Sequence, residues 1–319
     1  MQHQEPLRRF TLLLAIVSLA AWAWGAAVTQ QRTFATPRAA AQALLAAAEA
    51  DDVPAVMNMF GPDADAILHS GDPVQDKGNR AKFVTKAKQS MKVRIDRANA
   101  NRATLLIGAD AFPFPIPLVR RAGRWSFDTA AGKREILARR IGANELSTIA
   151  ACKAYVNAQY DYASEDRNKN GIPEYARKLI SSPGQRDGLF WPGADAPPTE
   201  FTSAVKQAVA EGYRKTGSKP TPYHGYNFRI LLAQGPKARG GTLNYIQHGS
   251  MIGGFGLVAW PAEYGVSGIM TFLVNQDGVV YEKDLGPSTT ATAENMTAFD
   301  PDKTWRPVGE TKGIASRSR

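Results

Sequence analysis

The chain has 319 residues, of which 44% are hydrophobic and 21% charged, so it is neither a wholly disordered chain nor a fibrous one. Its 39 Lys and Arg residues outnumber 29 Asp and Glu residues, a formal net charge of +10 at pH 7. The single cysteine, Cys152, excludes an intramolecular disulfide and a zinc site built from several cysteines. The length indicates about two domains.

The N-terminal segment has the pattern of a secretory signal peptide. Arg8 and Arg9 precede an apolar run from Phe10 to Trp24, and the small residues Gly25, Ala26 and Ala27 follow. We therefore predict a signal peptide over residues 1–27 and a periplasmic or secreted protein. The alternative is an uncleaved anchor, but the apolar run of 15 residues is shorter than the roughly 20 that a spanning helix needs. No later apolar run is long enough to cross a bilayer.

Residues 28–130 are predicted to form an α+β domain, with helices first and an antiparallel sheet after them. Thr36 and Pro37 are a helix-start signal, because threonine caps the helix and proline suits its first position. The Ala122–Gly123 pair indicates a tight hairpin. We expect helices at 37–49, 53–60 and 76–90, and strands at 93–97, 103–107, 118–120 and 125–127.

A proline repeat, Phe112-Pro-Phe-Pro-Ile-Pro117, interrupts this sheet. Proline cannot donate a backbone hydrogen bond, so the segment is extended and lies at a sheet edge. Its alternate apolar residues favour packing on the core. The alternative is a proline-rich ligand for an aromatic groove.

The second half is predicted to be another α+β domain over residues 141–290. Helical periodicity extends over 131–162 as one long helix or two, with a break expected at Gly142 and Asn144 capping the second part. Ile149, Cys152, Val156 and Tyr160 form the expected core stripe, in which Cys152 acts as a small buried hydrophobe. Further elements are expected as a helix at 200–212, strands at 227–232, 254–260, 268–274 and 279–284, and an extended or disordered tail at 291–319.

Several long motifs resemble an exported bacterial family, domain of unknown function 2950. They include Arg139-Arg-Ile-Gly-Ala-Asn-Glu-Leu146, Arg186-Asp-Gly-Leu-Phe-Trp-Pro192 and Ala259-Trp-Pro-Ala-Glu-Tyr-Gly-Val-Ser-Gly-Ile-Met-Thr-Phe272. Nearly all of the expected mature chain shares this resemblance. It implies export and family membership but no reaction, since the family has no established activity.

Two weaker resemblances concern the separate halves. Residues 141–283 resemble the globular head of type IV pilins and pseudopilins, in which a helix carries an antiparallel sheet. The chain differs from pilins in lacking a prepilin cleavage site beside a hydrophobic assembly helix. Residues 34–130 resemble nuclear-transport-factor-2-like or cystatin-like domains.

The best candidate site is a loop with the spacing D-x-N-x-N-G-I-x-E. Oxygen ligands at these positions suit Ca²⁺, and glycine at the sixth position permits the sharp turn. Arg177 stands where a calcium loop has its bidentate glutamate, so we expect weak binding at most. An Asn-Gly turn without metal is the alternative. The candidate ligands are Asp166, Asn168, Asn170, Ile172 and Glu174.

No motif identifies a catalytic set or another cofactor. His224 and His248 are the histidines that could meet at the second sheet, but two histidines without a placed carboxylate are an incomplete site. We expect an exported envelope protein with a noncatalytic binding or assembly role and an envelope protein or polysaccharide as partner. The scattered basic residues lack interleaved aromatics, which argues against nucleic acid. The alternative function is a periplasmic hydrolase with its site near His224 and His248.

Overall fold

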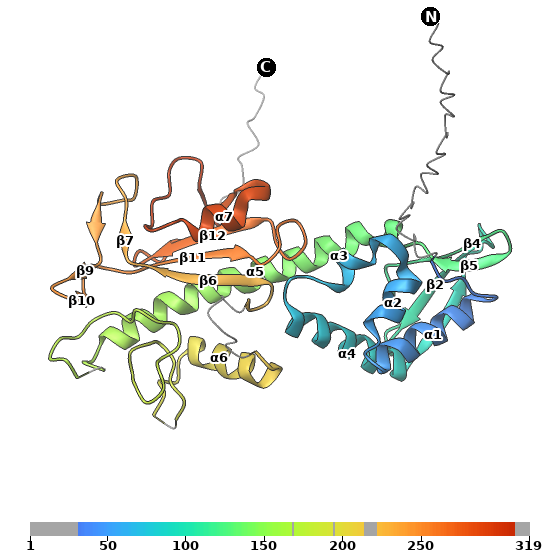
Figure 1. The fold of residues 1–319 in the computed structure, drawn as a ribbon, viewed down its shortest axis with the longest axis horizontal. Helices are drawn as coiled ribbons and strands as arrows, with labels where there is room; N and C mark the ends of the chain where they lie inside the picture. Colours follow the sequence, from blue (N-terminus) through green and yellow to red (C-terminus); the bar gives the residue numbers. More distant parts are fainter. Residues whose placement is uncertain (1–30, 168, 194, 214–221, 310–319) are drawn as a thin grey trace, which may run out of the picture.

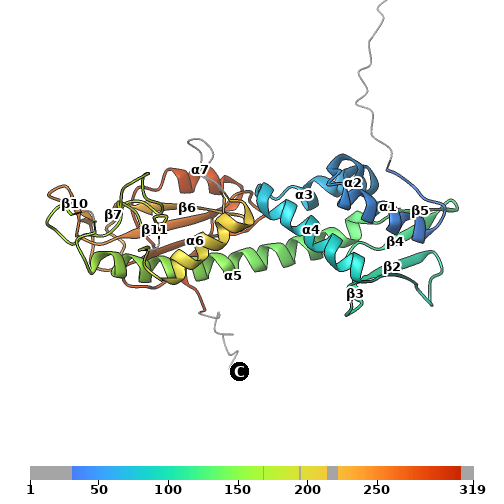
Figure 2. The ribbon, with the colours of Figure 1, turned by 90° about the horizontal axis from the view of Figure 1, so that it is seen from below.

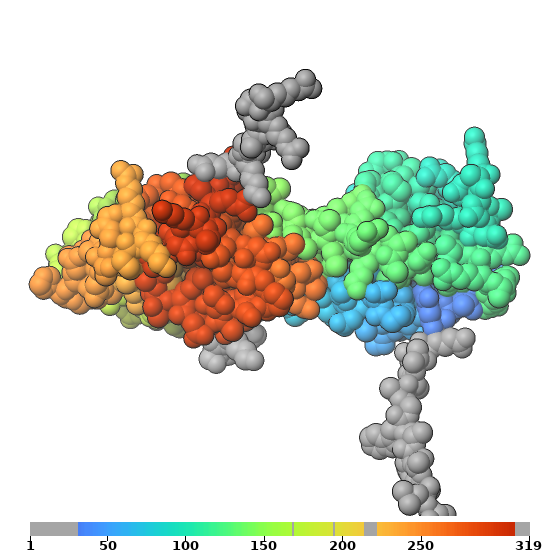
Figure 3. Space-filling view, turned by 90° about the horizontal axis from the view of Figure 1, so that it is seen from above, coloured from blue at the N-terminus to red at the C-terminus, as the bar shows by residue number. Residues whose placement is uncertain are grey.

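The computed structural model describes residues 31–309 except 168, 194 and 214–221. Two antiparallel sheets, each packed with helices, lie toward opposite ends of an elongated molecule (Figures 1 and 3). The predicted α+β class is confirmed. The predicted signal peptide, 1–27, lies outside the described residues, as does 310–319. Below, residues 31–140 are called the N-terminal unit and residues 141–309 the C-terminal unit.

Helix α5 (Thr129–Ala163) runs through both units as one helix of 35 residues (Figure 2). The predicted break at Gly142 is wrong. A single glycine weakens a helix by only about 1 kcal/mol, and packing at both ends outweighs that loss. Asn144 is not a cap either, because its buried side chain forms hydrogen bonds to other elements in mid-helix.

The N-terminal unit begins with helices whose caps are readable in the sequence. The Thr36 side chain accepts a hydrogen bond from the N–H of Ala39, and Asp52 and Asp72 cap the second and fourth helices in the same way. The helix predicted at 76–90 begins earlier, at the proline after its cap. The helices are α1 (Pro37–Glu49), α2 (Val53–Phe60), α3 (Ala64–Leu68) and α4 (Pro73–Gln89).

The first sheet has the strand order β1-β2-β4-β5, with β3 paired to β2. The helices α1 and α2 cover one face of it, where Leu105, Leu118 and Phe127 are buried. Ala122 and Gly123 form the predicted tight hairpin with positive φ angles, 47° and 77°. The strands are β1 (Met91–Ile95), β2 (Arg102–Ile107), β3 (Phe112–Pro113), β4 (Leu118–Arg121) and β5 (Arg124–Phe127).

The proline repeat lies against this core, as the packing interpretation expects. Ile116 is fully buried and Phe114 packs on the same cluster, whereas Phe112 is 40% exposed beneath the Arg139 guanidinium. The apolar residues of the segment therefore do not all turn inward.

The C-terminal unit is built on a second antiparallel sheet with the order β14-β13-β12-β11-β6. A turn over 275–278 lies between β12 and β13, and two separate two-stranded sheets, β7–β8 and β9–β10, accompany this sheet. The elements are α6 (Glu200–Glu211), β6 (Tyr226–Leu231), β7 (Ala233–Gln234), β8 (Leu243–Asn244), β9 (Ile246–Gln247), β10 (Ser250–Met251), β11 (Gly256–Pro261), β12 (Met270–Asn275), β13 (Tyr281–Asp284), α7 (Thr289–Glu294) and β14 (Arg306–Pro307).

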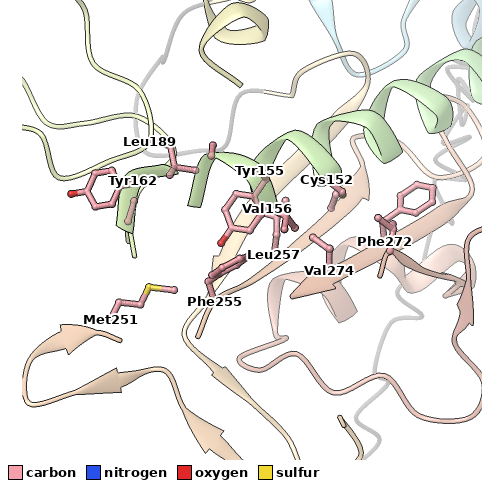
Figure 4. Packing of buried hydrophobic residues seen from close by; sticks show 14 of the residues in the cluster. Cys152, Tyr155, Val156, Tyr162, Leu189, Met251, Phe255, Leu257, Phe272 and Val274 are labelled. Carbon is pink, nitrogen blue, oxygen red and sulfur yellow. The ribbon is translucent and has the colours of Figure 1, made fainter. Parts of the chain in front are cut away.

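Both faces of this sheet are covered, which explains why every residue of β11 is buried. Leu257 and Ala259 face α5, where Cys152, Tyr155 and Val156 pack (Figure 4). Val258 and Trp260 alternate with them and face the opposite core.

That opposite core contains the segment that we expected to be a tail. Residues 291–309 instead continue α7 and then pack on the sheet through Phe299 and Trp305, and β14 pairs with β13. Arg229 donates hydrogen bonds to the carbonyl groups of Ala293 and Glu294 at the end of α7. The expected extended tail is therefore wrong for the described part of 291–319.

The core stripe predicted on α5 is largely confirmed. Cys152 is fully buried, Val156 is 7% exposed and Ile149 packs against the same cluster. Tyr160 differs, since it is 49% exposed and donates its hydroxyl hydrogen to the carbonyl of Gln276.

The burial of Cys152 leads to a reactivity prediction. Burial raises the pKa of its thiol to about 12, and the thiolate is the reactive form. We expect no reaction of the folded protein with a thiol reagent such as dithionitrobenzoate at pH 8, and one reacting thiol per chain in 8 M urea. Rapid labelling of the folded protein would contradict this burial.

Candidate functional site

A buried polar network joins the two units beside the middle of α5. Its centre is Asp72, which is 0% exposed and caps α4. One carboxylate oxygen accepts the hydrogen bond of the Gln75 N–H at 3.0 Å. The other accepts hydrogen bonds from the Tyr213 hydroxyl at 2.7 Å and the Gly225 N–H at 2.9 Å. A single side chain of the N-terminal unit is thus bound by two segments of the C-terminal unit.

Asn144 extends the network from α5 itself. Its Nδ2 donates to the carbonyl of Ser267 at 2.8 Å, and its Oδ1 accepts from Gln75 Nε2 at 2.8 Å. Gly225 packs so closely that a Cβ there would lie 2.4 Å from Asn144 Nδ2, and its φ of 77° also favours glycine. The junction therefore depends on this buried asparagine and on a glycine without a side chain.

Next to the network, three side chains stand in the order serine, histidine, carboxylate. The Ser147 Oγ lies 3.1 Å from His224 Nδ1, and His224 Nε2 lies 3.2 Å from Glu211 Oε2. Ser147 comes from α5, Glu211 from the last residue of α6, and His224 from the turn before β6. This is the contact order of a nucleophile, a base and an orienting acid.

Two neighbouring groups have shifted pKa values. Burial raises the pKa of Glu211, but hydrogen bonds from Gln207 and His224 outweigh burial and leave the pKa below its usual value. Burial and the hydrogen bond to Asp72 raise the pKa of the Tyr213 hydroxyl. Glu211 is therefore ionised at neutral pH, and Tyr213 keeps the proton that it donates to Asp72.

His248 does not join this group. It lies in the turn between β9 and β10, with a φ of 51°, whereas His224 precedes β6. Gly256, which follows the β9–β10 hairpin, pairs with Leu231 at the far end of β6, while Tyr226 pairs with Pro261. The two histidines therefore lie toward opposite ends of the β6–β11 pair, about 20 Å apart along strands of this length.

The candidate calcium loop brings four of its five predicted residues together. The Asp166 carboxylate accepts hydrogen bonds from the N–H groups of Asn170 and Gly171, at 3.1 and 2.8 Å. The Asn170 amide accepts from Ile172 N and donates to Glu174 Oε1 at 2.6 Å. Asn168 lies outside the described residues. In the described part of this loop, side-chain oxygens already accept hydrogen bonds from backbone and amide groups.

Glu174 ties the loop to the second sheet. It is 6% exposed, accepts a hydrogen bond from the Met251 N–H at 2.8 Å, and lies 3.5 Å from Arg177 Nη2. Arg177 in turn donates to the carbonyl of Gly249. Within the described residues, no group of three or more His, Cys, Asp or Glu residues is placed to hold a metal. A calcium site here would therefore need amide and carbonyl oxygens in addition to the carboxylates of Asp166 and Glu174.

The loop carries a prediction about calcium. A ligand that binds only the folded state stabilises it by about 2.7 kcal/mol at a hundredfold excess over Kd. We expect millimolar Ca²⁺ to raise the melting temperature of the wild-type chain slightly and that of Asp166→Ala not at all, relative to chelator. Identical melting curves with Ca²⁺ and with chelator would leave the loop as a metal-free Asn-Gly turn.

The junction residues were not predicted from the sequence. Asp72 followed by proline is a helix-start signal, but nothing in its spacing relates it to Tyr213 or Gly225. Ser147 and Glu211 lie on two helices at positions that fit ordinary solvent-facing residues. These contacts depend on how α4, α5 and α6 pack.

Comparison with known proteins identifies a family. A family model described as "Protein of unknown function (DUF2950)" matches residues 31–308. No curated protein and no solved structure matches the chain. In the described residues, no helix is both long enough and apolar enough to span a membrane.

Proposed function

The chain belongs to the DUF2950 family, whose function is unknown, and we propose that it is a noncatalytic binding protein of the cell envelope that holds an acidic polysaccharide. The charge distribution carries this proposal. Residues 31–140 contain 18 Lys and Arg against 11 Asp and Glu, whereas residues 141–309 are electrically neutral. A basic unit attracts an anionic polymer by long-range electrostatics.

Export is part of the proposal. It is motivated by the basic, apolar and small-residue order over residues 1–27, which would place the protein among envelope polysaccharides. The resemblance of residues 141–283 to pilin heads favours a role of the neutral unit in contacts with envelope proteins. The junction around Asp72 supports a rigid arrangement of the two units. The N-terminal unit would bind the polysaccharide, and the C-terminal unit would be held at a fixed distance from it.

The test is direct binding by the exported protein purified from the envelope fraction. We expect it to bind polygalacturonate but not neutral dextran of the same length, with affinity falling as NaCl rises from 50 to 300 mM. Equal binding to both polymers, or none to polygalacturonate at low salt, would contradict the proposal. An N-terminus at or near Val28 by mass spectrometry tests the export step separately.

A second candidate function is hydrolysis, favoured by the contacts among Ser147, His224 and Glu211. It ranks second because Ser147 lies inside α5, where backbone N–H groups are bonded to carbonyls one turn earlier and cannot form an oxyanion site. A hydrolase would lose ester or amide hydrolysis on Ser147→Ala at unchanged melting temperature. Absence of hydrolysis by the wild-type protein across such substrates would remove this candidate.

A further inference from the structure

The outward face of the first sheet is strongly basic. On β1, Met91 and Val93 pack against the core, so Lys92 and Arg94, which alternate with them along the strand, point away from it. The pairings Lys92↔Leu106, Arg94↔Thr104, Arg102↔Val119, Val119↔Ser126 and Arg121↔Arg124 put all of these residues on the same side. The outward strand positions therefore hold five basic residues, and Asp96, which directly follows β1 and donates its N–H to the carbonyl of Arg102, continues the same side.

The register arranges the five cations diagonally. Lys92 and Arg94 lie on β1, Arg102 is one row further on β2, and Arg121 and Arg124 are one row further again on β4 and β5. With strands about 4.8 Å apart and two-residue steps of about 6.7 Å, neighbouring Cα atoms in the series are about 5 to 8 Å apart and the series spans about 25 Å. We call these five residues the basic track.

The track is open to solvent and largely unpaired. All five residues are exposed, and the helices α1 and α2 cover the opposite face. Within the described chain, Lys92, Arg94 and Arg102 form no ion pair. Arg124 donates to Thr33 at the edge of the sheet, and Arg121 lies 3.9 Å from Asp128. Asp96, which follows β1, accepts a hydrogen bond from the N–H of Ala98.

We propose that the basic track binds a linear acidic polysaccharide, whose carboxylate or phosphate groups follow the diagonal from Lys92 to Arg124. This inference rests on the proposed function and locates its binding surface. Each arginine guanidinium can donate two parallel hydrogen bonds to two oxygens of one carboxylate or phosphate group. Such paired hydrogen bonds would hold the polymer along the basic track. The outward neutral residues, Thr104, Leu106, Val119 and Ser126, border the track along one side.

The arrangement favours a chain-like ligand over other polyanions. A single row of charges matches a linear polymer, whereas a bilayer surface would contact cations spread over the whole face. Single-stranded nucleic acid binds through aromatic side chains as well as cations, and the outward strand positions hold none. The basic track, about 25 Å long, would contact only a few sugar units of such a polymer.

The experiment compares two triple variants with equal loss of charge. The first, Lys92→Gln, Arg94→Gln, Arg102→Gln, removes the three track residues that form no ion pair within the described chain. The matched control, Lys77→Gln, Lys82→Gln, Lys86→Gln, removes three exposed lysines of α4 that form no ion pair within the described chain. Affinity for polygalacturonate is measured by calorimetry at 50 mM NaCl, and thermal melting checks that both variants fold.

We expect the track variant to bind about tenfold more weakly and the control less than twofold, given the usual strength of exposed charge contacts. Equal weakening of binding by both variants would contradict the basic track as the binding surface. The proposal that the N-terminal unit binds the polymer would still stand. Failure of the wild-type protein to bind polygalacturonate would overturn the proposed function itself. Binding of the wild type to phosphatidylglycerol vesicles in place of the polymer would overturn the choice of ligand.

Discussion

Asp72→Ala is expected to lower the free energy of unfolding by about 3 to 5 kcal/mol. The substitution removes the N-cap of α4, worth about 1 kcal/mol. It also leaves the Tyr213 hydroxyl and the Gly225 N–H without their acceptor, and a buried unpaired donor costs about 1 to 3 kcal/mol. Urea unfolding followed by circular dichroism measures the loss.

Asp52→Ala is the matched control for this prediction. Asp52 caps α2 through the same contact, to the N–H of Ala55, but it is exposed and has no hydrogen bond to the described residues of the other unit. We expect it to lower the free energy of unfolding by about 1 kcal/mol, the value of a helix cap alone. Equal losses for Asp52→Ala and Asp72→Ala would mean that the junction adds nothing to stability.

Gly142→Pro is expected to destabilise the protein by about 3 kcal/mol or more. Proline at this position removes the hydrogen bond to the carbonyl four residues earlier and places its ring against that carbonyl. Since α5 is the element shared by both units, a kink at residue 142 would also displace Asn144 and Ser147 from their partners at the junction. Thermal unfolding and far-ultraviolet circular dichroism check the effect.

Gly142→Ala is the control, and we expect it to raise the free energy of unfolding where Gly142→Pro lowers it. A Cβ at Gly142 would meet no atom within 4 Å, so the change only improves helix propensity. We expect stabilisation of about 0.5 to 1 kcal/mol. If proline were tolerated as well as alanine at residue 142, α5 would not be a continuous helix in solution.

Local signals in the sequence determined most element positions. Thr36 with Pro37 specified the start of α1, and the Ala122–Gly123 pair specified the hairpin between β4 and β5, because caps and tight turns depend on residues within a few positions. The Asn-Gly pair at residues 170–171 likewise indicated a turn, with or without a metal. These features need no information from the rest of the chain.

The covering of the second sheet was decided by tertiary packing. The unbroken apolar run over 256–260 is typical of a strand buried on both faces, but it does not reveal which segment supplies the second cover. Residues 291–309 read as a polar extension, since their few apolar residues, such as Phe299 and Trp305, are widely spaced. They pack because the face of the sheet opposite α5 carries apolar side chains, which form a core together with Phe299 and Trp305.

The sequence by itself determined the family, the α+β class and the local turns, and only the tertiary structure decided the continuity of α5, the junction and the basic track. Gly142 marks a break by propensity, yet α5 continues because it packs on both units. At the junction, Asp72 is bound by Tyr213, 141 residues further along the chain, and by Gly225, 153 residues further along. The track likewise depends on strand register, because a shift of one residue would turn Lys92 and Arg94 toward the core.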